Sequence, residues 1–60
     1  MDNYQVTFVF DYCTITARCN SDQEESAPDL AWGWVCESMD IGKTEMKSAI
    51  DIIVEKLEEA

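Results

Sequence analysis

Histidine is absent from this 60-residue chain, and only four of its residues are lysine or arginine. The absence of histidine excludes the imidazole-dependent catalytic triads and the imidazole-ligated metal sites. Against so few cations, thirteen aspartates and glutamates leave a formal net charge of −9. A field of that sign repels nucleic acid and anionic membranes and attracts basic protein surfaces. We therefore expect no direct binding to nucleic acid or to a membrane, and we expect a protein partner with a basic surface.

The three cysteines, Cys13, Cys19 and Cys36, form no CxxC pair, and any disulfide between two of them leaves the third unpaired. A secreted domain held together by disulfides usually carries an even number of more closely spaced cysteines. The chain also shows no basic region followed by an apolar run at its start, and no apolar stretch near the roughly 20 residues of a membrane span. These features predict a reducing, cytoplasmic location.

Sixty residues support one small domain, covering residues 1–60, because a chain this short buries only about 60% of the surface that its unfolded form exposes. The hydrophobic content of 47% is typical of globular domains and lies outside the range of disordered segments. A core of this size barely outweighs the conformational entropy lost on folding. We expect a folded domain that is marginally stable or dimeric.

Residues 4–19 alternate with a period of two and are mostly aromatic or β-branched, which is typical of half-buried strands. A two-residue connection at Asp11-Tyr12 places Phe10 opposite Cys13. Since Asp-Tyr is a poor dipeptide for a primed turn, a turn longer by one or two residues is the alternative. The pattern predicts a hairpin with one buried face. That face contains Tyr4, Val6, Phe8, Phe10, Cys13, Ile15, Ala17 and Cys19.

Two overlapping helix-start signals follow, at Ser21 and at Ser26, each with an acidic residue three positions later. Pro28 decides between them, because proline costs about 3 kcal/mol in the second turn of a helix but is tolerated in the first. We therefore predict a helix over residues 27–39. It is apolar on two sides, and such a helix is buried on both or leaves one for a partner. One side carries Leu30, Ala31 and Trp34, and the nearly opposite side carries Trp32, Cys36 and Met39.

The last segment, residues 44–58, fits two periodicities. Apolar residues spaced i, i+3, i+4, i+7 indicate an amphipathic helix, with only Ile52 off the stripe. Alternatively, Ile50, Ile52 and Val54 alternate as a third strand. Segment length and helix-forming residues favour the helix. The sequence thus predicts an α+β domain with a β-hairpin, a central helix and a C-terminal amphipathic helix, and a ββαβ arrangement is the alternative.

No set of side chains in the sequence assembles a catalytic or metal site. The neighbouring carboxylates Glu24-Glu25 and Glu58-Glu59 lie on polar segments, whereas general acid–base catalysis needs a buried or strongly coupled carboxyl group. A cysteine nucleophile needs a base and a positive field, for which Arg18 beside Cys19 is the only sign. The acidic run at residues 20–25 lacks the glycine and the final glutamate of an EF-hand loop. We expect no enzymatic activity, no metal and no cofactor.

The segment Asn20–Asp40 contains six acidic residues, no basic residue and both tryptophans. Acidic groups around aromatic anchors are typical of protein-binding hot spots that face a basic target. The glycine between the tryptophans, Gly33, is either simply tolerated or a low spot that admits another backbone. The alternative for both tryptophans is a place in the core. The candidate partner-binding residues are Asp22, Glu24, Glu25, Asp29, Trp32, Cys36, Glu37 and Met39.

Four segments resemble small acidic proteins encoded by bacteriophages, cyanophages included. The segments are Tyr4-Gln5-Val6-Thr7-Phe8, Asp11-Tyr12-Cys13-Thr14-Ile15, Ser21-Asp22-Gln23-Glu24-Glu25 and Trp34-Val35-Cys36-Glu37. The resemblance implies a role in the host cytoplasm, since such proteins include inhibitors of host RNA polymerase and DNA mimics that block nucleases or defence systems. The leading hypothesis is a non-enzymatic module that binds a basic surface of a host nucleic-acid-handling protein. The alternative is a homodimer whose acidity only confers solubility.

Overall fold

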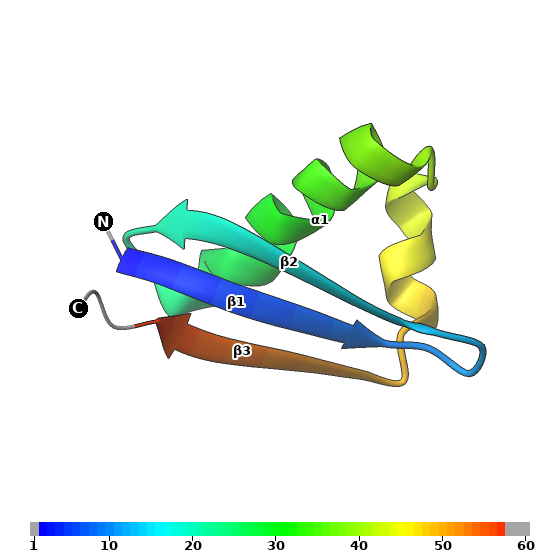
Figure 1. Ribbon diagram of the computed structural model, residues 1–60, viewed down its shortest axis with the longest axis horizontal. Helices are drawn as coiled ribbons and strands as arrows, with labels where there is room; N and C mark the ends of the chain where they lie inside the picture. The colour runs from blue at the N-terminus through cyan, green and yellow to red at the C-terminus, as the bar shows by residue number, and fades with distance from the viewer. Residues whose placement is uncertain (1, 58–60) are drawn as a thin grey trace.

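A computed structural model describes residues 2–57 and shows a three-stranded antiparallel sheet with a helix packed on one face (Figure 1). The first strand of the chain lies in the middle of the sheet, between the second and the third. The predicted α+β class is confirmed. In chain order the elements are β1 (Asp2–Val9), β2 (Thr14–Ser21), the 3-10 helix η1 (Glu24–Ser26), the α-helix α1 (Ala27–Met39), the 3-10 helix η2 (Lys43–Ser48) and β3 (Asp51–Leu57).

The predicted hairpin is confirmed together with its two-residue turn. β1 pairs with β2 along its whole length, and the backbone N–H of Phe10 donates to the carbonyl of Cys13 at 2.8 Å. Within residues 2–57, Asp40 is the only non-glycine residue with a positive φ. The Asp11-Tyr12 turn is therefore not of the primed type, which requires positive φ values.

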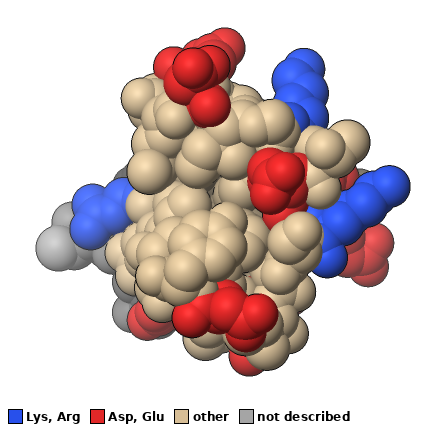
Figure 2. Space-filling view, turned by 90° about the vertical axis from the view of Figure 1, so that its right-hand side faces the viewer, with Lys and Arg blue, Asp and Glu red and all other residues tan. Residues whose placement is uncertain are grey.

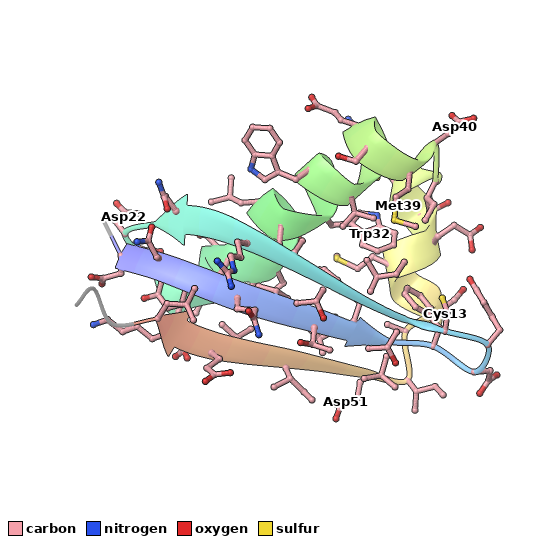
Figure 3. All side chains as sticks on the ribbon, viewed as in Figure 1. Cys13, Asp22, Trp32, Met39, Asp40 and Asp51 are labelled. Carbon is pink, nitrogen blue, oxygen red and sulfur yellow. The ribbon has the colours of Figure 1, made fainter. Side chains whose placement is uncertain are left out.

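The core lies between α1 and the alternate residues of β1 that face it. Val6 and Phe8 are fully buried there, as the period of two in β1 predicts. The prediction that Cys13 is buried is wrong: this cysteine is exposed because it lies beside the turn at the end of the sheet (Figure 3). The buried hydrophobic residues are Tyr4, Val6, Phe8, Phe10, Cys19, Ala27, Ala31, Trp32 and Val35.

The central helix α1 covers the predicted residues, with Pro28 in its first turn. The chain turns from β2 towards α1 at the buried Ser21, whose hydroxyl donates to the Gln23 carbonyl at 2.7 Å and accepts from the Gln23 N–H at 3.1 Å. Ser26 precedes the helix without a side-chain capping hydrogen bond. The serine spacing therefore marked the start of α1, although Ser26 does not cap it.

The predicted C-terminal helix over residues 44–58 is wrong. Most of its first half lies in η2, and residues 51–57 form β3, which pairs antiparallel with β1 from Val9↔Asp51 to Asn3↔Leu57. Residue 58 lies outside the described range. The strand forms because β2 occupies only one edge of β1, and residues 51–57 pair with the backbone N–H and C=O groups on the other edge. The β-branched run at residues 52–54 suits that pairing.

Because α1 packs mainly over β2 and β1, β3 is the least covered strand. Ile52 and Ile53 of this strand are exposed, as is Ile50 just before it. The described ends of the chain lie at one end of the sheet (Figure 1), where the Lys56 ammonium is 3.5 Å from the Asp2 carboxylate. On α1 itself, the exposed residues of the predicted binding set are Asp29, Glu37 and Met39.

Candidate functional site

The two tryptophans of α1 lie in opposite environments. Trp32 is 3% exposed. Its ring meets that of Phe8 edge-on at a centroid distance of 4.9 Å, and its Nε1–H donates to the Lys43 carbonyl at 3.0 Å. Trp34 is 59% exposed. Trp32 therefore takes the core position that the sequence left open as the alternative, and of the two tryptophans Trp34 is the one that a partner can reach.

The acidic candidates divide between the two ends of α1. Asp22, Glu24 and Glu25 precede the helix, whereas Glu37 and Asp40 lie at its far end, and all are exposed. A helix of 13 residues separates the two groups by about 20 Å, and Figure 3 labels Asp22 and Asp40 at opposite ends of the molecule. Figure 2 shows acidic side chains in separate groups, with uncharged surface between them and basic side chains at both sides. The acidic stretch of sequence is not one continuous patch.

These two acidic groups differ in their effect on folding. Negative charge near a helix N-terminus is stabilising, which accounts for Glu24, Glu25 and Asp29 without any partner. Glu37 and Asp40 lie at the C-terminal end, where negative charge is unfavourable by about 0.3–1 kcal/mol and where the last turn contains no basic residue. Asp40 also has a φ of 51°, a left-handed conformation that glycine adopts more easily. These two acidic residues oppose folding.

An open groove crosses the exposed side of α1. Its larger part is a hollow of about 720 Å³, and a smaller hollow of about 250 Å³ shares Gly33 and Lys43 with it. Asp29 and Met46 line the smaller part. The larger part is lined by Leu30, Gly33, Trp34, Cys36, Glu37 and the Ile41–Lys43 segment. The groove thus combines exposed apolar side chains with a carboxylate on each side of Gly33.

Gly33 forms the low point of this groove. A methyl group added there meets no atom within 4 Å, so no neighbour in the fold requires glycine. Glycine in an exposed helix interior is less favourable than alanine by about 1 kcal/mol. The stability of the isolated domain therefore does not explain this glycine.

The structure brings only part of the predicted binding set to this groove. Cys36 is half-buried and lines it, as do Asp29 and Glu37 in their respective parts. Met39 is exposed at the end of α1 (Figure 3) but is not among the lining residues. The prediction omitted Leu30 and Trp34, although their spacing of four residues places them on one helix face.

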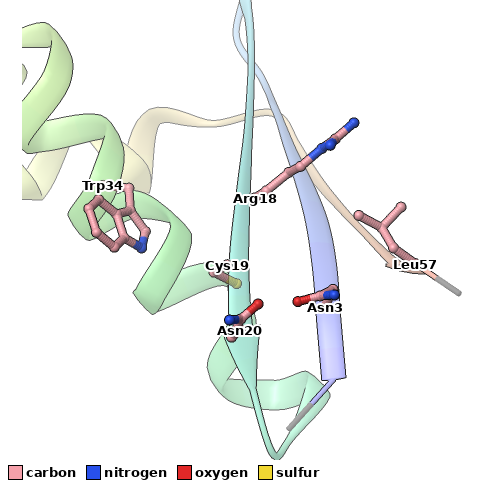
Figure 4. Close-up of a pocket in the computed structure, with 6 residues that line it drawn as sticks. All are labelled: Asn3, Arg18, Cys19, Asn20, Trp34 and Leu57. Atoms are coloured by element: carbon pink, nitrogen blue, oxygen red, sulfur yellow. The ribbon is translucent and has the colours of Figure 1, made fainter. Parts of the chain in front are cut away.

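A third hollow, of about 500 Å³, is lined by residues of all three strands and by Trp34 of α1. Figure 4 shows Trp34 on the helix side of β2, while Arg18 and Leu57 point to the other side. Burial raises the pKa of the Cys19 thiol, which lines this hollow, and a weaker effect of the Ala31 backbone lowers it. Because the thiolate is the reactive form, a raised pKa makes Cys19 a poor nucleophile.

Within residues 2–57, no group of three or more cysteine, aspartate, glutamate or histidine side chains is arranged to hold a metal ion. No helix in that range has the length and apolar composition needed to cross a membrane. The chain matches no protein-family model, no curated protein and no solved structure. The groove across α1 is therefore the feature from which a function is inferred.

Proposed function

We propose that this protein is a non-enzymatic protein-binding module whose partner contacts the exposed side of α1. The observation that carries the proposal is the 59% exposure of Trp34, which lines an apolar groove together with Leu30. An exposed indole adds little to the core, whereas tryptophan is among the residues most enriched in binding hot spots. Glu37 and Asp40, which oppose folding, lie at the end of the same helix.

The proposed partner presents a basic surface. A net charge of −9 on a domain of this size accelerates association with basic proteins through long-range attraction. The groove of an RNA polymerase or a nuclease that holds nucleic acid has this chemistry. Occupying such a groove in the host cytoplasm is the action of an inhibitor that mimics DNA, in keeping with the resemblance to small acidic phage proteins.

A pull-down with the immobilised protein from a candidate host extract tests this proposal. We expect a captured nucleic-acid-handling protein to be released as salt rises to about 0.5 M, where the Debye length is only a few ångströms. Trp34→Ala should abolish capture. The matched control is Tyr12→Ala, which removes another exposed aromatic ring at the hairpin turn, and it should leave capture unchanged. Capture that resists both salt and Trp34→Ala contradicts the proposal.

A homodimer is the second candidate, favoured by the exposed Ile52 and Ile53 of β3 and the exposed Ile50 just before it. An uncovered edge strand with apolar side chains offers a surface to a second copy. However, Asp51 and Glu55 on the same strand disfavour pairing of two identical edges. Sedimentation velocity at micromolar concentration decides between the states: a strict monomer eliminates this candidate, and a dimer that Ile52→Lys dissociates establishes it.

A further inference from the structure

We infer that the groove across α1 receives a basic amphipathic helix of the partner, packed closely against α1 at Gly33. This inference rests on the proposed function and specifies the structure of the bound segment. It derives from the arrangement of side chains on the exposed side of α1.

That side carries two adjacent rows of residues. Asp29, Gly33 and Glu37 are spaced four apart and therefore lie one turn above another, while Leu30 and Trp34 form the neighbouring row. All five residues are exposed. The two acidic residues are eight positions apart, which separates their Cα atoms by about 12 Å along the helix axis. The only gap in the charged row is the glycine between them.

A helix fits this surface better than an extended strand. A bound strand needs unpaired backbone groups along a sheet edge, and the backbone groups in the middle of α1 are already paired within the helix. Helices pack by inserting side chains of one into the grooves of the other. Gly33 leaves space for such an inserted apolar side chain, which would contact Leu30 and Trp34 on one flank and the Ile41–Lys43 segment on the other.

Charge selects a basic helix as the occupant. Among residues 2–57, the ion pair within the protein joins Lys56 to Asp2 and involves neither Asp29 nor Glu37. The carboxylates of these two residues are therefore available to a partner. Lysines or arginines seven or eight residues apart on a helix running alongside α1 match their separation of about 12 Å. Lys43 also lines the groove, and its positive charge opposes this attraction. We therefore expect Asp29 and Glu37 to strengthen the binding of a basic helix and Lys43 to weaken it.

The test uses the full chain and a synthetic amphipathic leucine–lysine helix as the probe. Its lysines are spaced to match Asp29 and Glu37, and a scrambled peptide of identical composition is the comparison. Binding is measured by calorimetry and by tryptophan emission, which should shift to shorter wavelength as Trp34 is covered. We expect the amphipathic peptide to bind about tenfold more tightly than the scrambled one, a difference of about 1.4 kcal/mol.

Substitution at Gly33 tests the close approach without changing charge. Gly33→Leu fills the low point and should weaken peptide binding about tenfold, and the open space at this position allows the variant to fold. Ser38→Leu adds the same side chain at an exposed helix position outside the groove lining, and it should leave the affinity unchanged. Equal affinity of Gly33→Leu and the wild type overturns the inference.

Charge variants should shift the affinity in opposite directions. Glu37→Gln should weaken peptide binding about two- to fivefold, whereas Lys43→Gln should strengthen it by about twofold. Asp22→Asn removes one negative charge, as Glu37→Gln does, but lies away from the groove. It should have a much smaller effect on the affinity for the peptide. If all three variants change the affinity according to net charge alone, the peptide is not held in the groove and the inference fails.

Thiol protection gives an independent readout. The half-buried Cys36 lines the groove, whereas the exposed Cys13 does not, so the bound peptide should slow alkylation of Cys36 alone.

Failure of the inference is distinguishable from failure of the proposed function. If no basic helix binds but Trp34→Ala still abolishes capture of a basic protein, the partner contacts α1 through another structure. If capture is also insensitive to Trp34→Ala, both are rejected.

Discussion

The indole Nε1–H of Trp32 donates a hydrogen bond of 3.0 Å to the backbone carbonyl of Lys43. This bond joins the middle of α1 to the first residue of η2, and the same indole ring packs edge-on against Phe8 of the central strand. One side chain therefore contacts the sheet, belongs to the helix and positions the segment that leads to β3. Trp34, two residues further along α1, is instead exposed.

The two tryptophans should differ sharply in their contribution to stability. Trp32→Phe loses the hydrogen bond and part of the packing on Phe8, and it should lower the free energy of unfolding by about 1–3 kcal/mol. Trp34→Phe should change it by no more than about 0.5 kcal/mol. Urea unfolding followed by circular dichroism measures both. Similar losses for the two variants would be incompatible with a buried Trp32 and an exposed Trp34.

Gly33→Ala should stabilise the isolated protein by about 1 kcal/mol, because alanine has a higher helix propensity and restricts the unfolded chain. The added methyl group meets no neighbour within 4 Å, so no steric loss offsets the gain. Thermal and urea unfolding provide the measurement. A destabilised variant would show that another part of the protein approaches this position closely.

Substitutions at Asp40 should separate the effects of charge and of backbone conformation. Asp40→Asn removes a negative charge from the helix C-terminus and should stabilise the protein by about 0.3–1 kcal/mol. Asp40→Gly also relieves the left-handed conformation and should stabilise it further, whereas Asp40→Ala keeps a less tolerant residue there. The expected order of unfolding free energies is Gly, Asn, then Asp. An alanine variant more stable than glycine would contradict the positive φ.

The buried Cys19 thiol should make stability fall at alkaline pH. Because burial raises its pKa in the folded protein, the unfolded chain loses its proton first, at about pH 8.5. Stability from the neutral thiol is therefore complete below that pH and decreases as pH rises towards the folded-state pKa. The difference in unfolding free energy between wild type and Cys19→Ala, measured from pH 7 to 10, isolates this contribution. A difference independent of pH excludes it.

The hairpin and α1 were predictable because their signals are local. Alternation along β1 fixed which side chains face the helix, and the pairing of Phe10 with Cys13 followed from the shortest possible connection. Pro28 fixed the start of α1 by excluding a helix from Ser21. Each of these effects acts within a few residues, so the neighbouring sequence contains the information needed.

β3 was not distinguishable from a helix by its own residues. Ile50 and Val54 fit both periodicities, and the β-branched residues only favour a strand once a pairing edge exists. That edge is provided by β1, more than 40 positions earlier in the chain. Val6 lies opposite Val54 and Phe8 opposite Ile52 in the sheet. The choice was therefore made by long-range pairing, which a local pattern does not report.

The candidate site was visible in part. Helical periodicity places Leu30 and Trp34 together, and a low spot at Gly33 was one of the two interpretations that the sequence left open. Which apolar side of α1 turns towards the sheet depends on tertiary packing. Trp32 lies in the core because its ring packs on Phe8 and its indole N–H bonds the Lys43 carbonyl. Both partners lie outside α1, so the sequence of the helix alone does not predict these contacts.

The position of β1 between its two neighbours makes completion of the sheet depend on a long-range contact. The hairpin and the groove-bearing helix involve residues close in sequence, so they can form before residues 51–57 pair with β1. Until then one edge of the central strand has no partner and is open to strands of other chains. Closing the long loop between residues 3 and 57 carries the entropy penalty of a non-local contact, which slows folding. The protein's greatest exposure to aggregation therefore precedes completion of its last strand.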